Sequence, residues 1–484
     1  MQAKRTHLTA PEDRIALSQK FAYAAGMLVN NLQAAALPAM MVILNLGLGM
    51  DPALVGLISF IPRIFDAVSD PLVGYVSDNT RSRWGRRRPF ILVGAILAGI
   101  FFAGMWQMPE GKSESLYFWF FLIALVSYFL VYTLYSTPFV AFGYEMTADY
   151  HERTRLHAFA NTAGQIAWLG VPWFYAIMAS DRFDDTVHGA RVLAIWVGGT
   201  IILLGVIPAL VCRERVVSQV TKSSASGLEG IARTTTDFFK GIVSTFKCKP
   251  FVKLCAATFL VFNGFQLGFS FTLYVMIYYV FGGDDQSAGE LNGWYGSLIA
   301  VATMAVIPLS AFISQRLGKK NTFRLTISLS LVGYGLKWIG YNPNSPYLLL
   351  MACPLVAFGT GSLFTLMGSM ISDVCDYDEL ESGQRREGMF GAIYWWMVKV
   401  GLALAGLLAG VLLKSSGFIT PDPDAVEPVV QSAKTLLYLR LFDIVIPTIT
   451  SSIALWIMWN YEISESRARE IRETLERRRG KLAS

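Results

Sequence analysis

The sequence predicts an all-α membrane protein with twelve transmembrane helices in two six-helix halves. Hydrophobic residues make up 54% of the 484 residues and charged residues 16%, whereas soluble domains average about 45–50% and about 25%. The mean hydropathy is +0.45. Long apolar runs recur along the chain, and a longer polar stretch separates the first six from the last six. The 13% content of aromatic residues excludes a disordered chain.

Each apolar run is read as a helix because about 20 residues cross a bilayer core and the backbone must satisfy its own hydrogen bonds there. The polar start, MQAKRTHLTAPEDR, does not resemble a secretory signal, so the first run is expected to be a retained span. The expected spans are 21–49, 53–76, 89–108, 116–145, 158–180, 193–212, 251–281, 291–315, 322–341, 346–373, 388–414 and 437–460.

The distribution of basic residues predicts the orientation. If the N-terminus is cytoplasmic, 31 of the 41 Lys and Arg residues fall in cytoplasmic segments and 5 in outside segments. The positive-inside rule produces this bias. We therefore expect an integral multi-pass protein of the plasma (inner) membrane with both termini in the cytoplasm.

The same pattern divides the chain into four parts. We expect an N-terminal six-helix bundle over 1–212, a cytoplasmic middle loop over 213–250, a C-terminal six-helix bundle over 251–460 and a charged cytoplasmic tail over 461–484.

A basic loop motif follows the second span and returns in weaker form after the eighth. The first copy, from Gly74 to Pro89, reads GYVSDNTRSRWGRRRP, and the second reads SAFISQRLGKK. Gly85 and Gly318 occupy matching places, 233 residues apart, which is about half the chain. Many secondary transporters are built from repeated halves. In the first copy, Asp78 is placed to cap a helix or to pair with an arginine.

Several classes of function are disfavoured. The basic residues sit in short blocks between apolar runs, so the net charge of +6 does not indicate a nucleic-acid partner. Neither a zinc-protease motif nor a nucleotide-binding loop is present. We therefore expect no enzyme and no cofactor, but a lipid bilayer and a small-molecule substrate as partners, and a monomer.

The second span carries three charged residues on one helix face. Arg63, Asp66 and Asp70 are spaced by three and four residues. Two neighbouring carboxylates repel each other, and a bound Na⁺, a shared proton or a nearby cation relieves that repulsion. The alternative is a structural ion pair between Arg63 and Asp66, which leaves Asp70 unexplained.

The eleventh span carries one lysine, Lys399, within a run that is otherwise free of charge from Met389 to Leu413. Such a lysine is expected to seek an acidic partner, which the second span offers, or else to extend to the membrane interface. A cation arriving at the carboxylates would compete with Lys399, which would couple ion binding to conformation. Lys337 and Arg440 are expected near interfaces and are given no role.

Three segments together resemble the melibiose-permease-like glycoside–pentoside–hexuronide:cation symporter family of the major facilitator superfamily. They are DAVSDPLVGYVSDNTRSRWGRRRP, the pair STPF and DYHERTR, and DVCDY followed by GQRREG and Lys399. The resemblance implies the major facilitator fold and a cation site at Asp66, Ser69, Asp70 and Thr133, with Arg63 and Lys399 in coupling. Ser69 stands where the family has Asn, and both Na⁺ and H⁺ stay open as the coupling ion.

The resemblance also implies a substrate site and a cytoplasmic gate. Asn31, Ser136 and Asn161 occupy the sugar-binding positions, and the aromatic run Tyr394, Trp395 and Trp396 is a candidate stacking wall for a sugar ring, with helix packing as the alternative. The gate residues are Asp78, Arg153, Asp373, Asp376 and Arg385, whose ion pairs are expected to break in the inward-open state.

The function implied is cation-coupled symport of a glycoside, oligosaccharide, pentoside or hexuronide by alternating access. A second hypothesis keeps the fold and changes the substrate to a lysophospholipid or another amphipathic metabolite. A membrane enzyme or receptor without transport is the third.

Overall fold

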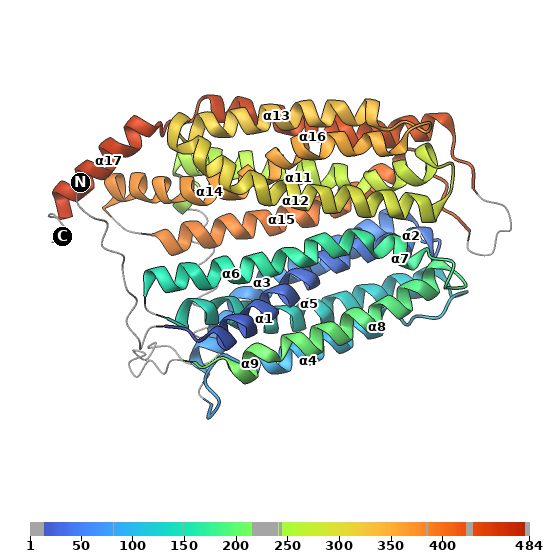
Figure 1. Cartoon of the computed structure of the whole chain (residues 1–484), viewed down its shortest axis with the longest axis horizontal. Coiled ribbons are helices and arrows are strands. Elements are labelled where there is room, and N and C mark those ends of the chain that lie inside the picture. The colour runs from blue at the N-terminus through green and yellow to red at the C-terminus, as the bar shows by residue number, and fades with distance from the viewer. Residues whose placement is uncertain are drawn as a thin grey trace. The chain divides into compact units, whose positions relative to one another are not determined.

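The computed structural model describes residues 14–80, 82–147, 149–214, 241, 244–383, 386–422 and 429–479. Throughout these ranges every regular element is a helix, as the long apolar runs predicted. Figure 1 labels the helices along the chain.

Nine helices among the described residues are long and apolar enough to cross a membrane. Three further helices, α3 (Pro52–Asn79), α6 (Tyr150–Gly170) and α13 (Lys319–Gly340), begin within eight residues of the remaining predicted spans. The nine are Leu17–Leu46, Arg88–Met105, Glu114–Glu145, Thr186–Val211, Lys249–Val280, Asp285–Leu317, Pro346–Ser382, Glu387–Ser415 and Ala433–Trp459.

The first compact unit contains Met1–Ile43 and Val68–Thr234. In it, α1 packs against α6, α8 and α9, and α4 packs against α5 and α8. The buried rings of Tyr23, Phe139 and Tyr135 stack in sequence, with centroids 4.7 and 5.5 Å apart. Its elements are α1 (Leu17–Met40), the end of α3, α4 (Arg88–Met105), α5 (Glu114–Glu145), α6, η2 (Val171–Trp173), α7 (Phe174–Met178), α8 (Thr186–Gly205) and α9 (Ile207–Val211).

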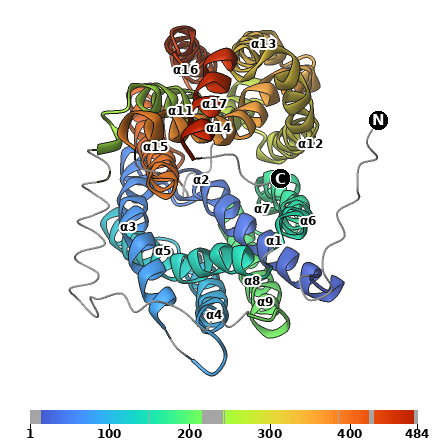
Figure 2. The same ribbon diagram turned by 90° about the vertical axis from the view of Figure 1, so that its left-hand side faces the viewer.

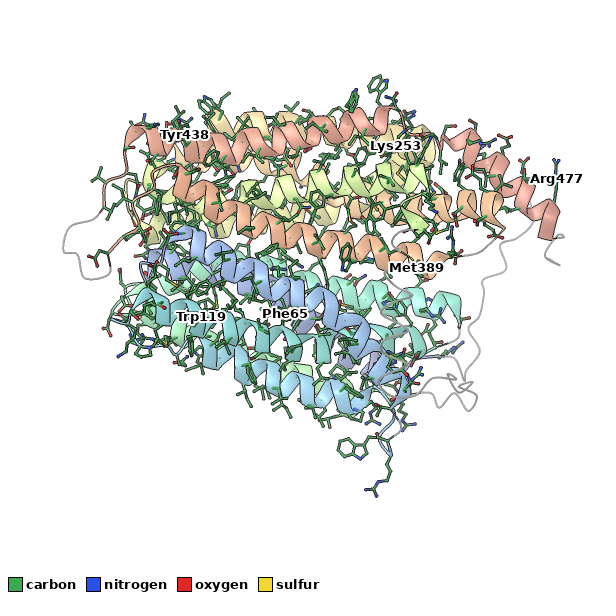
Figure 3. All side chains as sticks on the ribbon, turned by 180° about the vertical axis from the view of Figure 1, so that it is seen from behind. Phe65, Trp119, Lys253, Met389, Tyr438 and Arg477 are labelled. Carbon is green, nitrogen blue, oxygen red and sulfur yellow. The ribbon has the colours of Figure 1, made fainter. Side chains whose placement is uncertain are left out.

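The second compact unit contains Leu44–Ala67 and Thr235–Ser484. In it, α14 packs against α11, α12 and α13, which Figure 2 shows end on. In Figure 3, Lys253 and Met389 lie towards one end of this unit and Tyr438 towards the other. Its elements are the start of α3, α11 (Lys249–Val275), η3 (Met276–Val280), α12 (Asp285–Leu317), α13, η4 (Pro346–Ala352), α14 (Cys353–Ser382), α15 (Glu387–Ser415), α16 (Ala433–Trp459) and α17 (Glu465–Arg479). The short α2 (Val42–Leu46) spans the boundary between the units.

Local sequence explains where several helices start and stop. The Asp149 carboxylate accepts the Glu152 N–H at 2.7 Å, and the Asp284 carboxylate accepts the Ser287 N–H at 3.1 Å, so each aspartate caps the helix that follows. Gly318 ends α12 with a φ of +76°, which a residue with a Cβ rarely adopts.

The predicted middle loop and the predicted tail are described by the structure to different extents. The predicted middle loop, 213–250, lies mostly outside the described residues, and the predicted domain boundaries stay predictions. The predicted tail contains α17, whose Ile471 and Leu475 are buried in a helix that packs against α14.

Candidate functional site

The start of α3 packs closely along α15. A Cβ on Gly410 would lie 2.2 Å from the Pro52 carbonyl oxygen, and a Cβ on Gly406 would lie 2.9 Å from the Ser59 Cβ. Small residues at helix contacts allow this approach in membrane proteins. At one end of this contact, Lys414 pairs with Asp51 at 2.7 Å.

The same two helices bring Asp66 and Lys399 together. The Lys399 ammonium donates to the Asp66 carboxylate at 2.8 Å. The Asp66 side chain is 6% exposed and the Lys399 side chain 31%, so the pair is sheltered at the carboxylate and open on the lysine side. Arg63 lies one turn before Asp66 on α3 and is half-buried.

The end of α3 meets α5 through hydroxyl groups. Thr137 donates to the Asp70 carboxylate at 3.2 Å, and the hydroxyls of Ser69 and Thr133 lie 3.2 Å apart. Ser69 and Thr133 are buried. Thr137 was not predicted, although it lies one turn after Thr133 in the STPF segment. Carboxylate and hydroxyl oxygens are ligands suited to a hard cation.

The predicted substrate residues of the first unit lie on neighbouring helices. Asn31 on α1 contacts Gly164 of α6, where a Cβ would lie 2.3 Å from the Asn31 amide nitrogen. Asn161 precedes Gly164 by three residues and is exposed. Ser136, on α5, is half-buried.

Sequence reasoning missed Gln33. Its side chain is 2% exposed, and neither end of its amide has a hydrogen-bond partner among the described residues. A buried amide lacking partners is destabilising unless a ligand or water supplies them, so Gln33 joins the candidate substrate residues. A glutamine within an apolar run is the signal that could have found it.

The three aromatic residues of α15 do not form one flat wall. Tyr394 is 2% exposed and packs in the core of the second unit with Phe251, Phe390 and their neighbours. Trp395 is 57% exposed. Successive residues of a helix point in different directions, because one turn takes 3.6 residues. Helix packing therefore describes Tyr394, and only Trp395 and Trp396 keep an accessible ring surface.

The first basic loop motif holds a compact ion-pair network. Arg87 pairs with Asp78 at 2.8 Å and with Glu145 at 2.7 Å, and Arg86 also pairs with Glu145. The Glu214 carboxylate accepts the backbone N–H groups of Arg86 and Arg87, at 3.1 and 3.3 Å. The motif is thus tied to the ends of both α5 and α9.

The second copy of the motif is built in the same way within the other unit. Lys319 pairs with Asp373, in the last third of α14, at 2.7 Å. Glu465, at the start of α17, lies over Gly318, where a Cβ would be 3.0 Å from its carboxylate. The predicted repeat is therefore visible in the contacts of each unit taken alone.

The predicted gate residues have the following surroundings. Arg153 donates to the Thr147 carbonyl at 3.1 Å. Asp376 is half-buried on α14, and nearby Asp378 pairs with Arg386 at 2.6 Å. Arg385 lies outside the described residues. The expected pairing between Arg153 or Arg385 and the α14 aspartates stays a prediction.

A second charged cluster lies near Arg153, at the start of α6. The Glu152 carboxylate accepts hydrogen bonds from Lys20 at 2.6 Å and from the Ile15 N–H at 3.2 Å, and Arg155 lies 3.5 Å away. Burial alone would raise the pKa of Glu152, but the hydrogen bonds and the two positive charges outweigh it and lower that pKa.

The expectation for Lys337 was wrong. Lys337 is 3% exposed and lies within the second unit instead of at an interface. Its ammonium is 2.5 Å from the carboxylate of Asp443, a residue that is fully buried. The partners are 106 residues apart in the sequence, so hydropathy alone did not indicate their contact.

These features define a class of protein. The chain is an all-helical membrane protein with charged residues inside its helices and a repeated basic loop motif, as in secondary transporters. A family model described as MFS/sugar transport protein matches residues 22–465. The chain belongs to this family, the glycoside–pentoside–hexuronide symporters of the major facilitator superfamily.

Relatives agree with this assignment, and a solved structure agrees with the fold. The glucuronide carrier protein homolog of Escherichia coli is 26% identical, with 87% of each chain covered. The isoprimeverose transporter of Lactiplantibacillus pentosus is 24% identical, covering 78% of this chain and 76% of its own. The crystal structure of a D-xylose-proton symporter has a TM-score of 0.64 at 14% identity, over 93% of this chain and 98% of its own.

The chain is therefore an integral multi-pass membrane transporter with the major facilitator fold and a small-molecule substrate, and it is not an enzyme. Within the described residues, no group of three or more His, Cys, Asp or Glu side chains is arranged to hold a metal ion.

Proposed function

We propose that the chain is a cation-coupled symporter that carries a glycoside, oligosaccharide, pentoside or hexuronide by alternating access. Asp66 and Asp70 bind the coupling cation, Na⁺ or H⁺, and Lys399 is its internal competitor. Two relatives are named glucuronide carrier protein homolog and isoprimeverose transporter, which favours a sugar derivative over a lysophospholipid.

The observation that carries the proposal is the ion pair between Asp66 and Lys399. The carboxylate is nearly buried, so a cation that reaches it must displace the ammonium 2.8 Å away. The displaced ammonium has a route to a more polar position, since its side chain is 31% exposed. Binding of the cation thereby changes the contact between α3 and α15, and this differential contact is what coupling requires.

The second carboxylate lies four residues further along α3, beside different oxygen atoms. Asp70 accepts a hydrogen bond from Thr137, and Ser69 and Thr133 contribute two more hydroxyls nearby. Hydroxyl oxygens ligate Na⁺ and also relay protons. We therefore assign Asp70 to cation binding, with Ser69, Thr133 and Thr137 as supporting groups.

The substrate groups proposed in the first unit are amides and a hydroxyl. Asn31, Asn161 and Ser136 both donate and accept hydrogen bonds, as sugar hydroxyls require. Gln33 adds a buried amide with its hydrogen-bonding capacity unused. Trp395 and Trp396 are the proposed surfaces for stacking.

The test is uptake by proteoliposomes that contain the purified protein. Labelled glucuronide and isoprimeverose are offered under an inward Na⁺ gradient, under an inward H⁺ gradient and with no gradient. We expect one gradient to drive accumulation of at least one probe. Equal uptake in all three conditions would reject coupling.

Two variants test the assigned carboxylates. Asp66→Asn and Asp70→Asn should each abolish gradient-driven accumulation while the purified protein stays monodisperse. Asp51→Asn is the matched control, because Asp51 is also an ion-paired aspartate of the α3 region but lies at the far end of the α15 contact. Full coupling in both Asp66→Asn and Asp70→Asn would remove them from the proposed site.

We also propose that the chain lies in the plasma (inner) membrane with both termini in the cytoplasm. The support is the excess of Lys and Arg in the segments that this orientation makes cytoplasmic. Reporter proteins that are active on one side only, fused at either terminus, test it. Activity of a periplasmic reporter at either end would reverse the assignment.

A further inference from the structure

A buried ionic cluster joins three helices of the second unit. The Asp443 carboxylate, on α16, accepts hydrogen bonds at 2.5 Å from Lys337 of α13 and at 2.8 Å from Thr272 of α11. Its other oxygen accepts a hydrogen bond from Tyr341 at 2.5 Å. The Lys337 ammonium also lies 3.2 Å from the Thr272 hydroxyl and 5.4 Å from the centre of the Tyr295 ring.

A contribution to the stability of the fold does not explain why this ion pair is buried. Removing two charges from water generally costs more than their attraction returns, and apolar residues of similar size often stabilise a fold as well or better. Inside a membrane-spanning bundle, a charged residue indicates function by default. The cluster shares no residue with the group Asp66, Asp70 and Lys399, and the transport mechanism proposed above does not use it.

A small cavity reaches both members of the ion pair. The space inside it that a water-sized sphere can occupy is about 10 Å³, which is room for about one water and far below the roughly 300–1,000 Å³ of pockets that enclose a drug-sized ligand. A glycoside is therefore too large for it, whereas water fits. The lining includes Phe265, Phe269, Tyr295, Tyr334, Lys337 and Asp443.

The choice of ligand follows from this geometry. A metal cation at Asp443 would meet the Lys337 ammonium, which already lies 2.5 Å from the same carboxylate oxygen. An anion at Lys337 would meet the carboxylate. A proton needs neither space nor further ligands, and water in the cavity can deliver it.

We propose that the Asp443 carboxylate is a proton-binding site of the transporter, exchanging its proton with water in this cavity. This inference rests on the proposed function in one respect: it names H⁺ as an ion that the transport cycle uses, at a site outside α3. Loading the proton changes the net charge of the Lys337–Asp443 pair from zero to +1.

The proton transfer is balanced within the cluster. A hydronium ion in the cavity gives its proton to the carboxylate and leaves as water, so that one O–H bond breaks and one forms. The oxygen that faces Tyr341 then donates, and the Tyr341 hydroxyl turns from donor to acceptor, as a hydroxyl group can. Neutralising the carboxylate weakens the link between α13 and α16, which gives the proton a structural effect.

Other titratable or charged groups face the cluster from each packed element. From α11 the cluster receives the neutral hydroxyl of Thr272. The Arg440 guanidinium, one turn before Asp443, lies over the rings of Tyr279 and Trp338, 4.2 and 4.1 Å from their centres. Among the described residues, Tyr295, Tyr334, Tyr341 and Cys353 are further titratable side chains close to the pair.

Infrared difference spectroscopy of the full-length reconstituted protein tests the proposal without any substrate. Acidification should produce the carbonyl band of a protonated carboxylic acid, shifted in heavy water. The band should be lost in Asp443→Asn and kept in Asp66→Asn. In Tyr341→Phe the band should change in frequency, because the carboxyl oxygen that faces Tyr341 has lost its hydrogen-bond partner.

Asp443→Asn alone leaves Lys337 unpaired and can misfold. The double variant Lys337→Met with Asp443→Asn controls for this, because it removes both charges. A wild-type difference spectrum that this folded double variant reproduces unchanged would overturn the proposal. Uptake by the wild-type protein keeps the two hypotheses apart: an Asp443-dependent band in wild-type protein that shows no gradient-driven uptake supports the proton site and counts against the proposed symport.

Discussion

At the scale of single residues, the pairing of Asp66 with Lys399 determines what each substitution does. Removing one partner leaves the other charge unpaired in a largely apolar setting, whereas removing both partners leaves no unpaired charge. The exposed side of Lys399 lets water reduce this penalty, so the effect is smaller than for a sealed pair.

We therefore expect Asp66→Asn to lower the free energy of unfolding by about 1–2 kcal/mol, and the double variant Asp66→Asn with Lys399→Ala to recover part of that loss. Thermal unfolding of the purified proteins, compared as a double-mutant cycle, measures it. Strictly additive effects of the two substitutions would show that the 2.8 Å contact contributes nothing.

Residue environments were the least predictable part of the site. A lone lysine in an apolar span was expected to find an acid, and Asp66 is that acid. The contact of Lys337 with Asp443 was not foreseen, and for Tyr394 the sequence left stacking and helix packing open, because both outcomes depend on which helices become neighbours. Hydropathy reports whether a segment prefers lipid and carries no information about partners more than 100 residues away.

At the scale of elements, the contact between α3 and α15 depends on glycine. Gly410 leaves no room for a side chain beside the Pro52 carbonyl and Gly56. Gly391, on the same helix, has open space around the position of a Cβ. The two positions therefore form a matched pair for substitution.

We expect Gly410→Ala to lower the free energy of unfolding by about 1–3 kcal/mol through overpacking, and to reduce coupled uptake because it separates Lys399 from Asp66. Gly391→Ala should leave both properties near wild type. Thermal unfolding and proteoliposome uptake of the two variants test this prediction. Equal stability and equal uptake in Gly410→Ala and Gly391→Ala would contradict the close contact.

The start of α6 should respond to acid. Because the pKa of Glu152 is lowered from its usual value of 4.5, the hydrogen bonds from Lys20 and Ile15 stabilise the folded protein fully at any pH above 4.5. This stabilisation is lost as the pH falls through the lower pKa of the folded state. Glu152→Gln should therefore be less stable by about 1 kcal/mol at neutral pH. This deficit should shrink in acid, as measured by thermal unfolding across pH. A constant deficit would contradict the assignment.

Most helix positions were predictable, because membrane-spanning helices are long and apolar. The predicted span 388–414 corresponds to α15 at Glu387–Ser415, and 116–145 corresponds to α5 at Glu114–Glu145. The helix over the predicted span 158–180 begins earlier, at Tyr150 in a polar stretch, and helical structure continues through η2 and α7 to Met178. A helix end outside the apolar core leaves no hydropathy signal.

At the scale of the whole molecule, compact packing does not follow the order of the sequence. Residues 44–67 belong to the second unit although they come from the first quarter of the chain. They supply the surface that contacts Gly406 and Gly410 and the carboxylate that neutralises Lys399.

A chain divided between residues 214 and 244 tests this dependence. We expect the fragment from 244 onward to aggregate when produced alone and to be recovered when the first fragment is produced with it, because α15 otherwise lacks its partner. Size-exclusion chromatography and thermal unfolding of the purified material provide the readout. A monodisperse second fragment, as stable alone as with its partner, would contradict it.

The position of Asp66 also constrains how the protein is made. The ribosome delivers this aspartate 333 residues before the lysine that will neutralise it. During that interval Asp66 lies in lipid or in the insertion machinery without its counter-charge. The helix that carries Asp66 can therefore reach its final position only late in synthesis. Biogenesis of this transporter should therefore be most vulnerable, to heat or to a shortage of insertion factors, in the period before α15 emerges.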